Sequence, residues 1–469
     1  MSDKDPKKNT LIWEKDDPEL LESFCTDYRH FISDHKTERE CVAGMREILR
    51  RNGAVDLKDA CEEKTVPKPG DLVFADMMKK SLIIFRIGKR PVTDGMQLLG
   101  AHIDSPRMDL KQHALYEKND LALFETHYYG GIKKYQWVAL PLALHGVVAK
   151  KDGSVIPVSI GEKPEDPVFG VSDLLIHLAG KQMAKRASEA VEGEKLNVLV
   201  GSRPIKSDDE DGENVKAAIL RILKDQLDIE EDDFFSAEIE VVPAGAAREY
   251  GLDRSMIMGY GQDDRVCAYP SFRAILDESE PEFTSVCLLT DKEEIGSVGA
   301  TGMHSRFFEN SVAELMNLMG CFSELNLRRT LRRTRVLSSD VSAAFDPNYP
   351  DVMEKNNCSY LGLGPVFNKY TGSRGKSGSN DANAEYIAYL RKVMDDAGIV
   401  YQSGELGKVD EGGGGTIAYI LANLGMEVID FGVAVLNMHA PWEITSKADI
   451  YETYLAYRAF LATGLDRPL

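Results

Sequence analysis

Short apolar runs alternate with longer helical patterns along most of this chain. Runs of this length are typical of buried strands, and the helical patterns between them are typical of the crossovers in an α/β protein. We therefore predict an α/β fold with a mixed sheet between helices. The predicted strands are 97–104, 284–291, 334–340 and 426–435, and the predicted helices are 173–188, 215–227, 266–278, 311–331, 383–398, 416–425 and 448–465.

The pattern changes in the middle of the chain. Segments 122–131 and 138–162 alternate apolar and polar residues, as antiparallel strands and hairpins do. Segment 201–216 is a polar loop, and its acidic run is expected to be a solvated face. We interpret this region as an inserted, mostly β domain. The predicted division is 108–235 for the inserted domain, and 1–107 with 236–469 for the main domain.

The balance of charges argues against some partners. The chain has 76 acidic and 56 basic residues, which gives a formal net charge of −20. Nucleic acid or an anionic membrane would require a basic face, so neither is expected as a partner. No apolar run approaches the roughly 20 residues that span a bilayer, and the polar N-terminal sequence lacks the apolar segment of a secretory signal. Seven scattered cysteines form no CxxC pair, so we expect a cytoplasmic protein with reduced thiols.

Imidazole and carboxylate side chains follow four of the predicted strands. In open α/β sheets, ligands bind outside the carboxyl ends of the strands. A lone histidine there is more often a hydrogen-bonded structural residue, and adjacent carboxylates are usually surface groups. Their coincidence nevertheless predicts a nitrogen and oxygen donor set suited to zinc, manganese or cobalt. The candidates are His102, Asp104, Asp291, Glu293, Glu294, Asp340 and His439, and the pair Asp263-Asp264 directly precedes a helical pattern.

The short motif HID suggests how one ligand is oriented. A histidine that binds a metal generally needs its other ring nitrogen held by a carboxylate or a carbonyl. Asp104, two residues beyond His102 on a strand, would point to the same face. The alternative is that Asp104 is the N-cap of a turn.

Six segments, taken in order, resemble the motifs of the aspartyl-aminopeptidase family of metallopeptidases. The resemblance runs from about residue 98 to the C-terminus. It implies a split metallopeptidase domain that carries an inserted β domain. It also implies a two-metal aminopeptidase that releases N-terminal residues, possibly acidic ones, from peptides with a free N-terminus. The segments are GAHIDSPRMDLK, QDDR, TDKEEIGS, SSDVSAAFDPNYP, GGGGTIAYILANLG and NMHAPWE.

The resemblance also assigns roles to individual residues. It implies two divalent ions, most simply zinc, with His102 on one ion and His439 on the other. Asp263 would bridge the ions, although Asp264 remains a possible bridge. Glu293 would be the general base that takes a proton from water activated by the two metals. The implied metal ligands are His102, Asp263, Glu294, Asp340 and His439, and the implied catalytic residues are Glu293 and Asp104.

Substrate contacts and assembly are further implications of the resemblance. Four glycines, Gly412 to Gly415, precede the helical segment 416–425. They are either a flexible helix entry or a place where backbone approaches the substrate. The implied substrate-binding residues are Lys369, Gly414 and Gly415. The inserted domain would mediate dimerisation, and dimers would assemble into a tetrahedral homododecamer.

The chain departs from the family in the inserted domain. The stretch YYGGIKKYQWVALPLALHG lacks the aromatic-Phe-Asp-Arg-Asp-Leu sequence of the family and the histidine that follows its glycines. Lys133, Lys134 or Tyr135 stands in that neighbourhood, so a preference for acidic N-terminal residues is left open. Two alternatives to an aminopeptidase are another two-metal amide hydrolase and a catalytically silent scaffold of the same fold.

Overall fold

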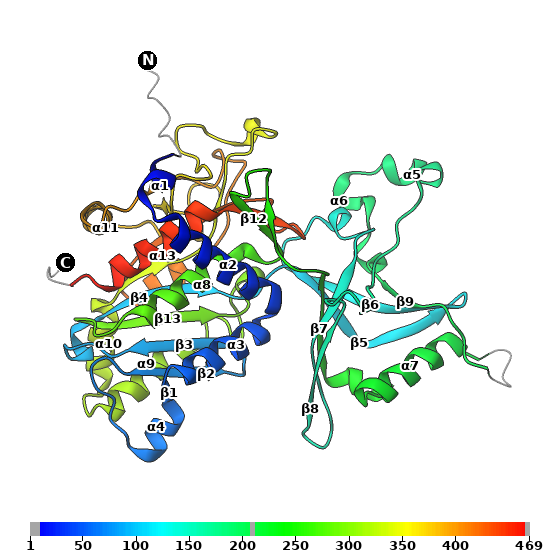
Figure 1. Ribbon diagram of the computed structural model, residues 1–469, viewed down its shortest axis with the longest axis horizontal. Helices are drawn as coiled ribbons and strands as arrows, with labels where there is room; N and C mark the ends of the chain where they lie inside the picture. The colour runs from blue at the N-terminus through cyan, green and yellow to red at the C-terminus, as the bar shows by residue number, and fades with distance from the viewer. Residues whose placement is uncertain (1–9, 207–211, 465–469) are drawn as a thin grey trace. The chain divides into compact units, whose positions relative to one another are not determined.

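The computed structural model describes residues 10–206 and 212–464 (Figure 1). The chain forms two compact units. The first contains Met1–Asp104, Ala247–Met438 and Glu443–Leu469, and the second contains Ser105–Ala246 and His439–Trp442. The boundaries between the two units therefore lie at 104/105 and 246/247, whereas the sequence analysis placed the domain boundaries at 107/108 and 235/236. Four residues from the C-terminal part of the chain also join the second unit.

The main sheet of the first unit is mixed, which confirms the predicted fold class. Its central strand β4 runs parallel to β13 and β14, and β14 runs parallel to β18, so these strands end at the same edge. Figure 1 shows β4, β13 and β3 side by side. In the described ranges the sheet has nine strands, in the order β1 (Val55–Asp56), β2 (Leu72–Met77), β3 (Ser81–Arg86), β13 (Thr284–Thr290), β4 (Met96–His102), β14 (Arg335–Ser338), β18 (Glu427–Gly432), β16 (Val366–Asn368) and β17 (Gln402–Ser403).

Helices pack on both faces of this sheet because β4 is apolar on both sides. Leu99 and Ala101 belong to one buried cluster, and Leu98 belongs to the other, as the alternation of side chains along a strand requires. The first cluster includes residues of α2 (Pro18–Asp34), α3 (Glu38–Arg51), α8 (Gln262–Asp277), α11 (Ala384–Asp396) and α13 (Lys447–Leu461). The second includes residues of α4 (Leu57–Glu63), α9 (Phe307–Leu318), α10 (Glu324–Arg333) and α12 (Ala418–Ala422).

Gly100 lets α12 pack closely on β4. A Cβ atom at this position would lie 3.3 Å from Cδ1 of Ile417 and 3.6 Å from Cδ1 of Leu421. Ile417 is the N-cap of α12, and it directly follows Thr416 and the four glycines. The helix that carries the glycines therefore rests on the sheet at a residue without a side chain.

A smaller sheet in the first unit explains why one predicted strand is interrupted. The run 426–435 is divided into β18 and β19, which belong to different sheets. At Gly432, where β18 ends, a Cβ atom would lie 2.0 Å from the carbonyl oxygen of Asp340, so the two backbones are in close contact. The strands of the smaller sheet are, in order, β11 (Arg248–Tyr250), β12 (Met256–Gly259), β20 (Glu443–Ser446), β19 (Ala434–Leu436) and β15 (Ser342–Ala343).

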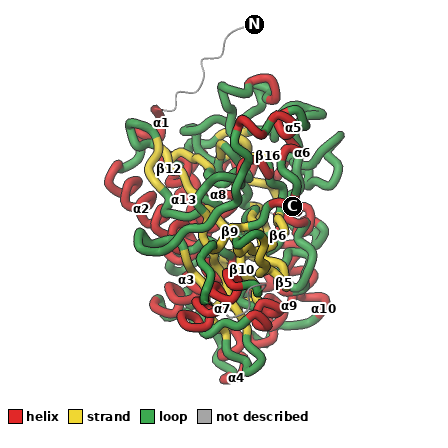
Figure 2. Tube along the Cα trace, turned by 90° about the vertical axis from the view of Figure 1, so that its right-hand side faces the viewer, coloured by secondary structure: helices red, strands yellow, loops and turns green. Residues whose placement is uncertain are grey.

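The second unit is built on an antiparallel sheet, with α7 (Asn214–Leu227) packed against β5, β6 and β9. Figure 2 shows β5, β6, β9 and β10 of this sheet in the region of α7. Residues 207–211 of the predicted acidic loop lie outside the described residues. The order of the strands is β8 (Val155–Ile160), β7 (Leu142–Ala149), β10 (Ala237–Pro243), β5 (Arg107–Lys118), β6 (Leu121–Tyr129) and β9 (Val198–Gly201).

Two helix predictions were wrong. The segment 173–188 forms only short turns of helix, because its large apolar side chains are more than half exposed in the described structure, and packing supplies most of the stability of a helix. The segment 311–331 is two helices, because Gly320 has φ 71° and Ser323 caps a new helix. The sequence analysis also assigned no element before residue 97, where α1 (Thr10–Lys15) to α4 and β1 to β3 are found.

Among the residues that the structure describes, no helix is long and apolar enough to span a membrane.

Candidate metal centre

His102 lies at the carboxyl end of β4 and is 2% exposed. Its Nε2 lies 3.2 Å from Oδ1 of Asp263 and 3.9 Å from Oε2 of Glu293. Its Nδ1 lies 3.1 Å from the carbonyl oxygen of Asp104, a geometry in which a ring N–H donates to that oxygen. Burial acts to lower the pKa of His102, but hydrogen bonds with Asp104 and Asp263 outweigh it and raise the pKa.

Asp104 joins this imidazole to the turn that carries the two adjacent glutamates. Its Oδ1 lies 3.3 Å from Nδ1 of His102 and accepts the backbone N–H of Glu293 at 3.1 Å. Its Oδ2 accepts the backbone N–H of Glu294 at 3.2 Å. Asp104 contacts the imidazole, as the sequence suggested, and its hydrogen bonds go to a distant turn rather than to a turn that follows it directly. That turn is 189 residues further along the chain, so the sequence alone could not locate it.

The adjacent acids of the QDDR motif both face His102. The peptide bond between Asp263 and Asp264 is cis, and both residues have non-helical dihedral angles within α8. Asp263 directs Oδ1 at the ring, whereas Oδ2 of Asp264 accepts the backbone N–H of His102 at 3.3 Å. Burial raises the pKa of Asp264 well above its usual value.

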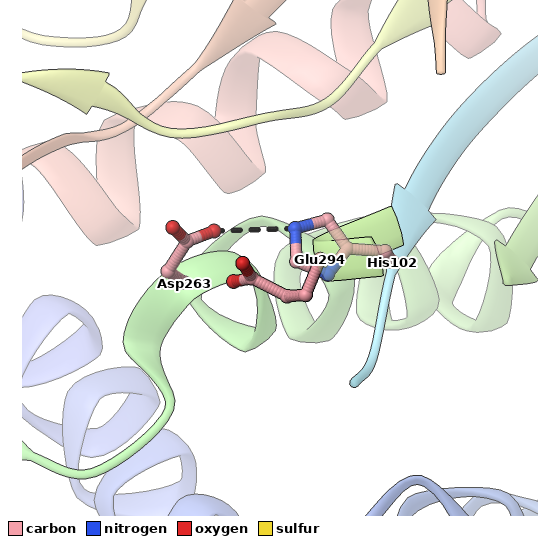
Figure 3. Close-up of side chains that lie close together, drawn as sticks. All are labelled: His102, Asp263 and Glu294. Atoms are coloured by element: carbon pink, nitrogen blue, oxygen red, sulfur yellow. Dashed lines mark hydrogen bonds and ion pairs between the residues drawn. The ribbon is translucent and has the colours of Figure 1, made fainter. Parts of the chain in front are cut away.

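These side chains form two overlapping groups that could hold cations. His102, Asp263 and Glu294 offer ligand atoms that all lie within 4.8 Å of one another, and so do His102, Asp264 and Asp340. Figure 3 shows the first group, with His102 and Asp263 directed at each other. Burial and the neighbouring Asp264 also raise the pKa of Asp340. Imidazole nitrogen with carboxylate oxygens is a donor set that fits zinc, and a cation would offset the repulsion among these buried carboxylates.

His439 lies in the second unit, outside both groups. Its Nδ1 lies 3.0 Å from the carbonyl oxygen of Gly131 in the same unit, and its backbone has φ 64°. This hydrogen bond orients the ring within the second unit.

The residues expected to contact substrate lie on loops of the first unit. Nζ of Lys369 lies 2.6 Å from Oδ1 of Asp381. The carbonyl oxygen of Gly414 accepts the backbone N–H of Gly372 at 2.6 Å. Around Gly415, a Cβ atom would meet nothing within 4 Å, so its backbone borders open space.

Glu443 is a supporting residue to which the sequence analysis gave no role. Its Oε2 accepts the backbone N–H of Asp263 at 3.0 Å, and its carbonyl oxygen accepts from Nε2 of Gln262 at 2.6 Å. The side chain is 1% exposed. The sequence signal that could have identified Glu443 is its position in the motif NMHAPWE, four residues after His439.

Together, this edge of the sheet and its donor set are those of a metal-dependent peptidase. A family model described as "Aminopeptidase I zinc metalloprotease (M18)" matches residues 31–461, and the chain belongs to this family. The predicted resemblance and the predicted metalloaminopeptidase activity are therefore confirmed at the level of the family.

Individual relatives agree with this assignment. The chain is 60% identical over 458 residues to a protein of Clostridium acetobutylicum described as "Probable M18 family aminopeptidase 1", and the match covers 97% of this chain and 98% of that one. The crystal structure of an M18 aminopeptidase from Thermotoga maritima superposes with a TM-score of 0.92 at 46% identity, covering 96% of this chain and 98% of that chain. The mApe1 dodecamer of S. cerevisiae shares the fold, with a TM-score of 0.76 at 19% identity, covering 94% of this chain and 97% of that chain.

Proposed function

We propose that this aminopeptidase uses two divalent ions, most simply zinc, with Glu293 as the general base. The observation that supports this proposal best is the position of Asp104, which contacts His102 and holds both glutamates through their backbone N–H groups. The imidazole, a ligand carboxylate and the base are thereby fixed relative to one another. Bound ions would lower the pKa of the attacking water and polarise the scissile carbonyl.

The residues divide into ligands and a proton carrier. His102 offers Nε2, because its Nδ1 is held at Asp104. Asp263 is the preferred bridging ligand, since its Oδ1 faces that nitrogen, and Asp264, which belongs to the second donor group, is the alternative bridge. The further proposed ligands are Glu294, Asp340 and His439, the last of which rests on the NMHAPWE motif and stays a prediction.

Glu293 would move a proton during the reaction. Its side chain is 16% exposed, so the carboxylate can reach both the cluster and a substrate. It would take a proton from the attacking water and pass it to the amine that leaves. A positioned base of this kind contributes about 10²–10⁴ in rate.

Substrates would be peptides with a free N-terminus, bound beside Lys369, Gly414 and Gly415. The seven cysteines are free thiols within the described chain, which supports a reducing, cytoplasmic setting for this peptide turnover.

We also propose that the chain assembles into a homo-oligomer through the second unit. Six large apolar side chains between residues 168 and 183 are 53–70% exposed, and exposed apolar surface of this kind marks protein interfaces. The dodecamer formed by the yeast protein with the same fold supports dimers that assemble into a tetrahedral dodecamer here. Light scattering on the purified protein tests the assembly. The exposed residues are Val168, Leu174, Leu175, Ile176, Leu178 and Met183.

The activity test uses single-residue amide substrates with chelated protein, before and after zinc, manganese or cobalt is added. Restored release from substrates with a free α-amine, and none from acyl-blocked ones, is the expected result. Restored hydrolysis of the blocked substrates alone would favour a different amide hydrolase. Two bound metals without turnover of any substrate would favour a silent scaffold.

A further inference from the structure

Two lysines share one carboxylate in the segment 369–382 of the first unit. Nζ of Lys369 lies 2.6 Å from Oδ1 of Asp381, and Nζ of Lys376 lies 2.9 Å from Oδ2 of the same side chain. All three side chains are between 41% and 48% exposed. The two hydrogen bonds lower the pKa of Asp381, which keeps it ionised at neutral pH.

A second acid completes the charge balance around these lysines. Nζ of Lys376 lies 3.8 Å from the centre of the Tyr370 ring, and the hydroxyl of Tyr370 donates to Oε1 of Glu405 at 2.5 Å. Two ammonium groups and two carboxylates therefore stand around one aromatic ring. These four charges balance one another, while Arg374 of the same segment adds one positive charge.

The same segment is in direct contact with the four glycines, Gly412 to Gly415. The backbone N–H of Gly372 donates to the carbonyl oxygen of Gly414 at 2.6 Å. Gly413 has φ 137°, and a Cβ atom there would lie 2.2 Å from the carbonyl oxygen of Gly372. Charges on segment 369–382 are thus held beside the backbone at which the proposed function places the substrate.

We propose that Asp381 is a specificity-determining residue, which pairs with Lys369 and Lys376 and thereby offsets one of the two positive charges that would favour an acidic N-terminal residue. The inference rests on the proposed function, because it requires the substrate beside the four glycines. Asp381 acts through the lysines, so it is a positioning residue and takes no part in bond cleavage. The chain should accordingly prefer neutral N-terminal residues over acidic ones.

The size of the effect follows from the loss of one negative charge close to the substrate. At roughly 6–8 Å and a dielectric between about 40 and that of water, one unit charge changes the preference for an acidic residue by about three- to tenfold. Salt reduces the effect, since the groups are half-exposed.

The experiment compares kcat/KM for glutamyl and leucyl amides with zinc-loaded, full-length protein. Asp381→Asn should raise the glutamyl-to-leucyl ratio about three- to tenfold, and Asp381→Glu should keep the original ratio. In Lys376→Gln one positive charge is removed and Asp381 pairs with Lys369 only, so the glutamyl-to-leucyl ratio should fall. Asp396→Asn is the matched control, because Asp396 forms an exposed pair with Lys392 at 2.5 Å elsewhere in the same unit, and it should leave the ratio unchanged.

Each outcome decides between the proposals. An active wild type whose ratio stays within twofold in Asp381→Asn, or shifts equally in Asp396→Asn, overturns the inference and leaves the proposed function intact. If Asp381→Asn fails to fold, the direction of the shift in Lys376→Gln decides, and a raised or unchanged ratio overturns the inference. A wild type that releases no N-terminal residue with any metal overturns both.

Discussion

Replacing Asp104 by asparagine should weaken metal binding and destabilise the chain at the same time. The carboxylate is 0% exposed and accepts two backbone N–H groups, at 3.1 and 3.2 Å, while it lies 3.3 Å from Nδ1 of His102. Asparagine offers one acceptor in place of two. If its oxygen stays at His102 and Glu293, its NH₂ faces the backbone N–H of Glu294, and a buried donor loses its partner.

The magnitude follows from these contacts. An unpaired buried donor costs about 1–3 kcal/mol, and loss of the charge weakens the remaining hydrogen bond by about 1 kcal/mol. The free energy of unfolding should therefore fall by about 2–4 kcal/mol. Loss of a carboxylate that orients a ligand histidine typically lowers metal affinity about 10–100-fold.

Two measurements check this prediction. Competition with a chromogenic chelator gives the zinc affinity, and denaturant unfolding of the metal-free protein gives the stability. The control is Asp166→Asn, because Asp166 also accepts two backbone N–H groups, at 3.1 and 3.3 Å, but in an exposed loop of the second unit. Zinc affinity within twofold of the wild type in Asp104→Asn would refute the idea that Asp104 orients the ligand.

Three further predictions concern the base, the metal and a buried acid. Glu293→Gln should keep zinc and the melting temperature but lose about 10²–10⁴ in kcat, and near-normal turnover would contradict its role as general base. Removal of the metal by a chelator should lower Tm. Free zinc at about 1,000 times its Kd should restore about 4 kcal/mol of the free energy of unfolding, as calorimetry with and without zinc would show. Burial raises the pKa of Asp449 to about 7, well above the roughly 3.9 of an unfolded chain. Between these two pKa values the folded state binds a proton that the unfolded state does not. The stabilisation from Asp449 is therefore complete below pH 4 and is lost as the pH rises to 7, at up to about 1.4 kcal/mol per pH unit. Denaturant unfolding at several pH values should show that the free energy of unfolding of Asp449→Asn lacks this dependence on pH.

The strands that carry the centre could be predicted because they are buried on both faces. QLLGA, TSVCLLT and RVLS each contain an apolar run with few polar residues, and they lie in β4, β13 and β14, whose residues are all buried. Parallel strands end at one edge, so His102, Asp340 and the glutamate turn were expected to be close together. The structure brings His102 together with acids of all these segments.

Other features depend on partners that are distant in the chain, so their sequence signals were weak. Asp104 and the glutamates it holds are separated by 189 and 190 residues, and Asp263 and Glu443 by 180. The helix expected at 173–188 had the right spacing of apolar residues but no surface to pack against in the chain itself. Local pattern determines which face of a helix is apolar, whereas its stability depends on whether something covers that face.

The missing side chain at Gly100 has a consequence far from the sheet in which it lies. Two of the three side chains nearest to a Cβ atom there, Ile417 and Leu421, belong to the N-cap and body of the short helix that follows the glycines of the proposed substrate loop. A methyl group at Gly100 would require the Ile417 side chain at the start of this helix to shift by a few tenths of an ångström. Atomic volume in the interior of the sheet thus bears on how the segment after the glycines is seated, one layer beneath the proposed substrate loop.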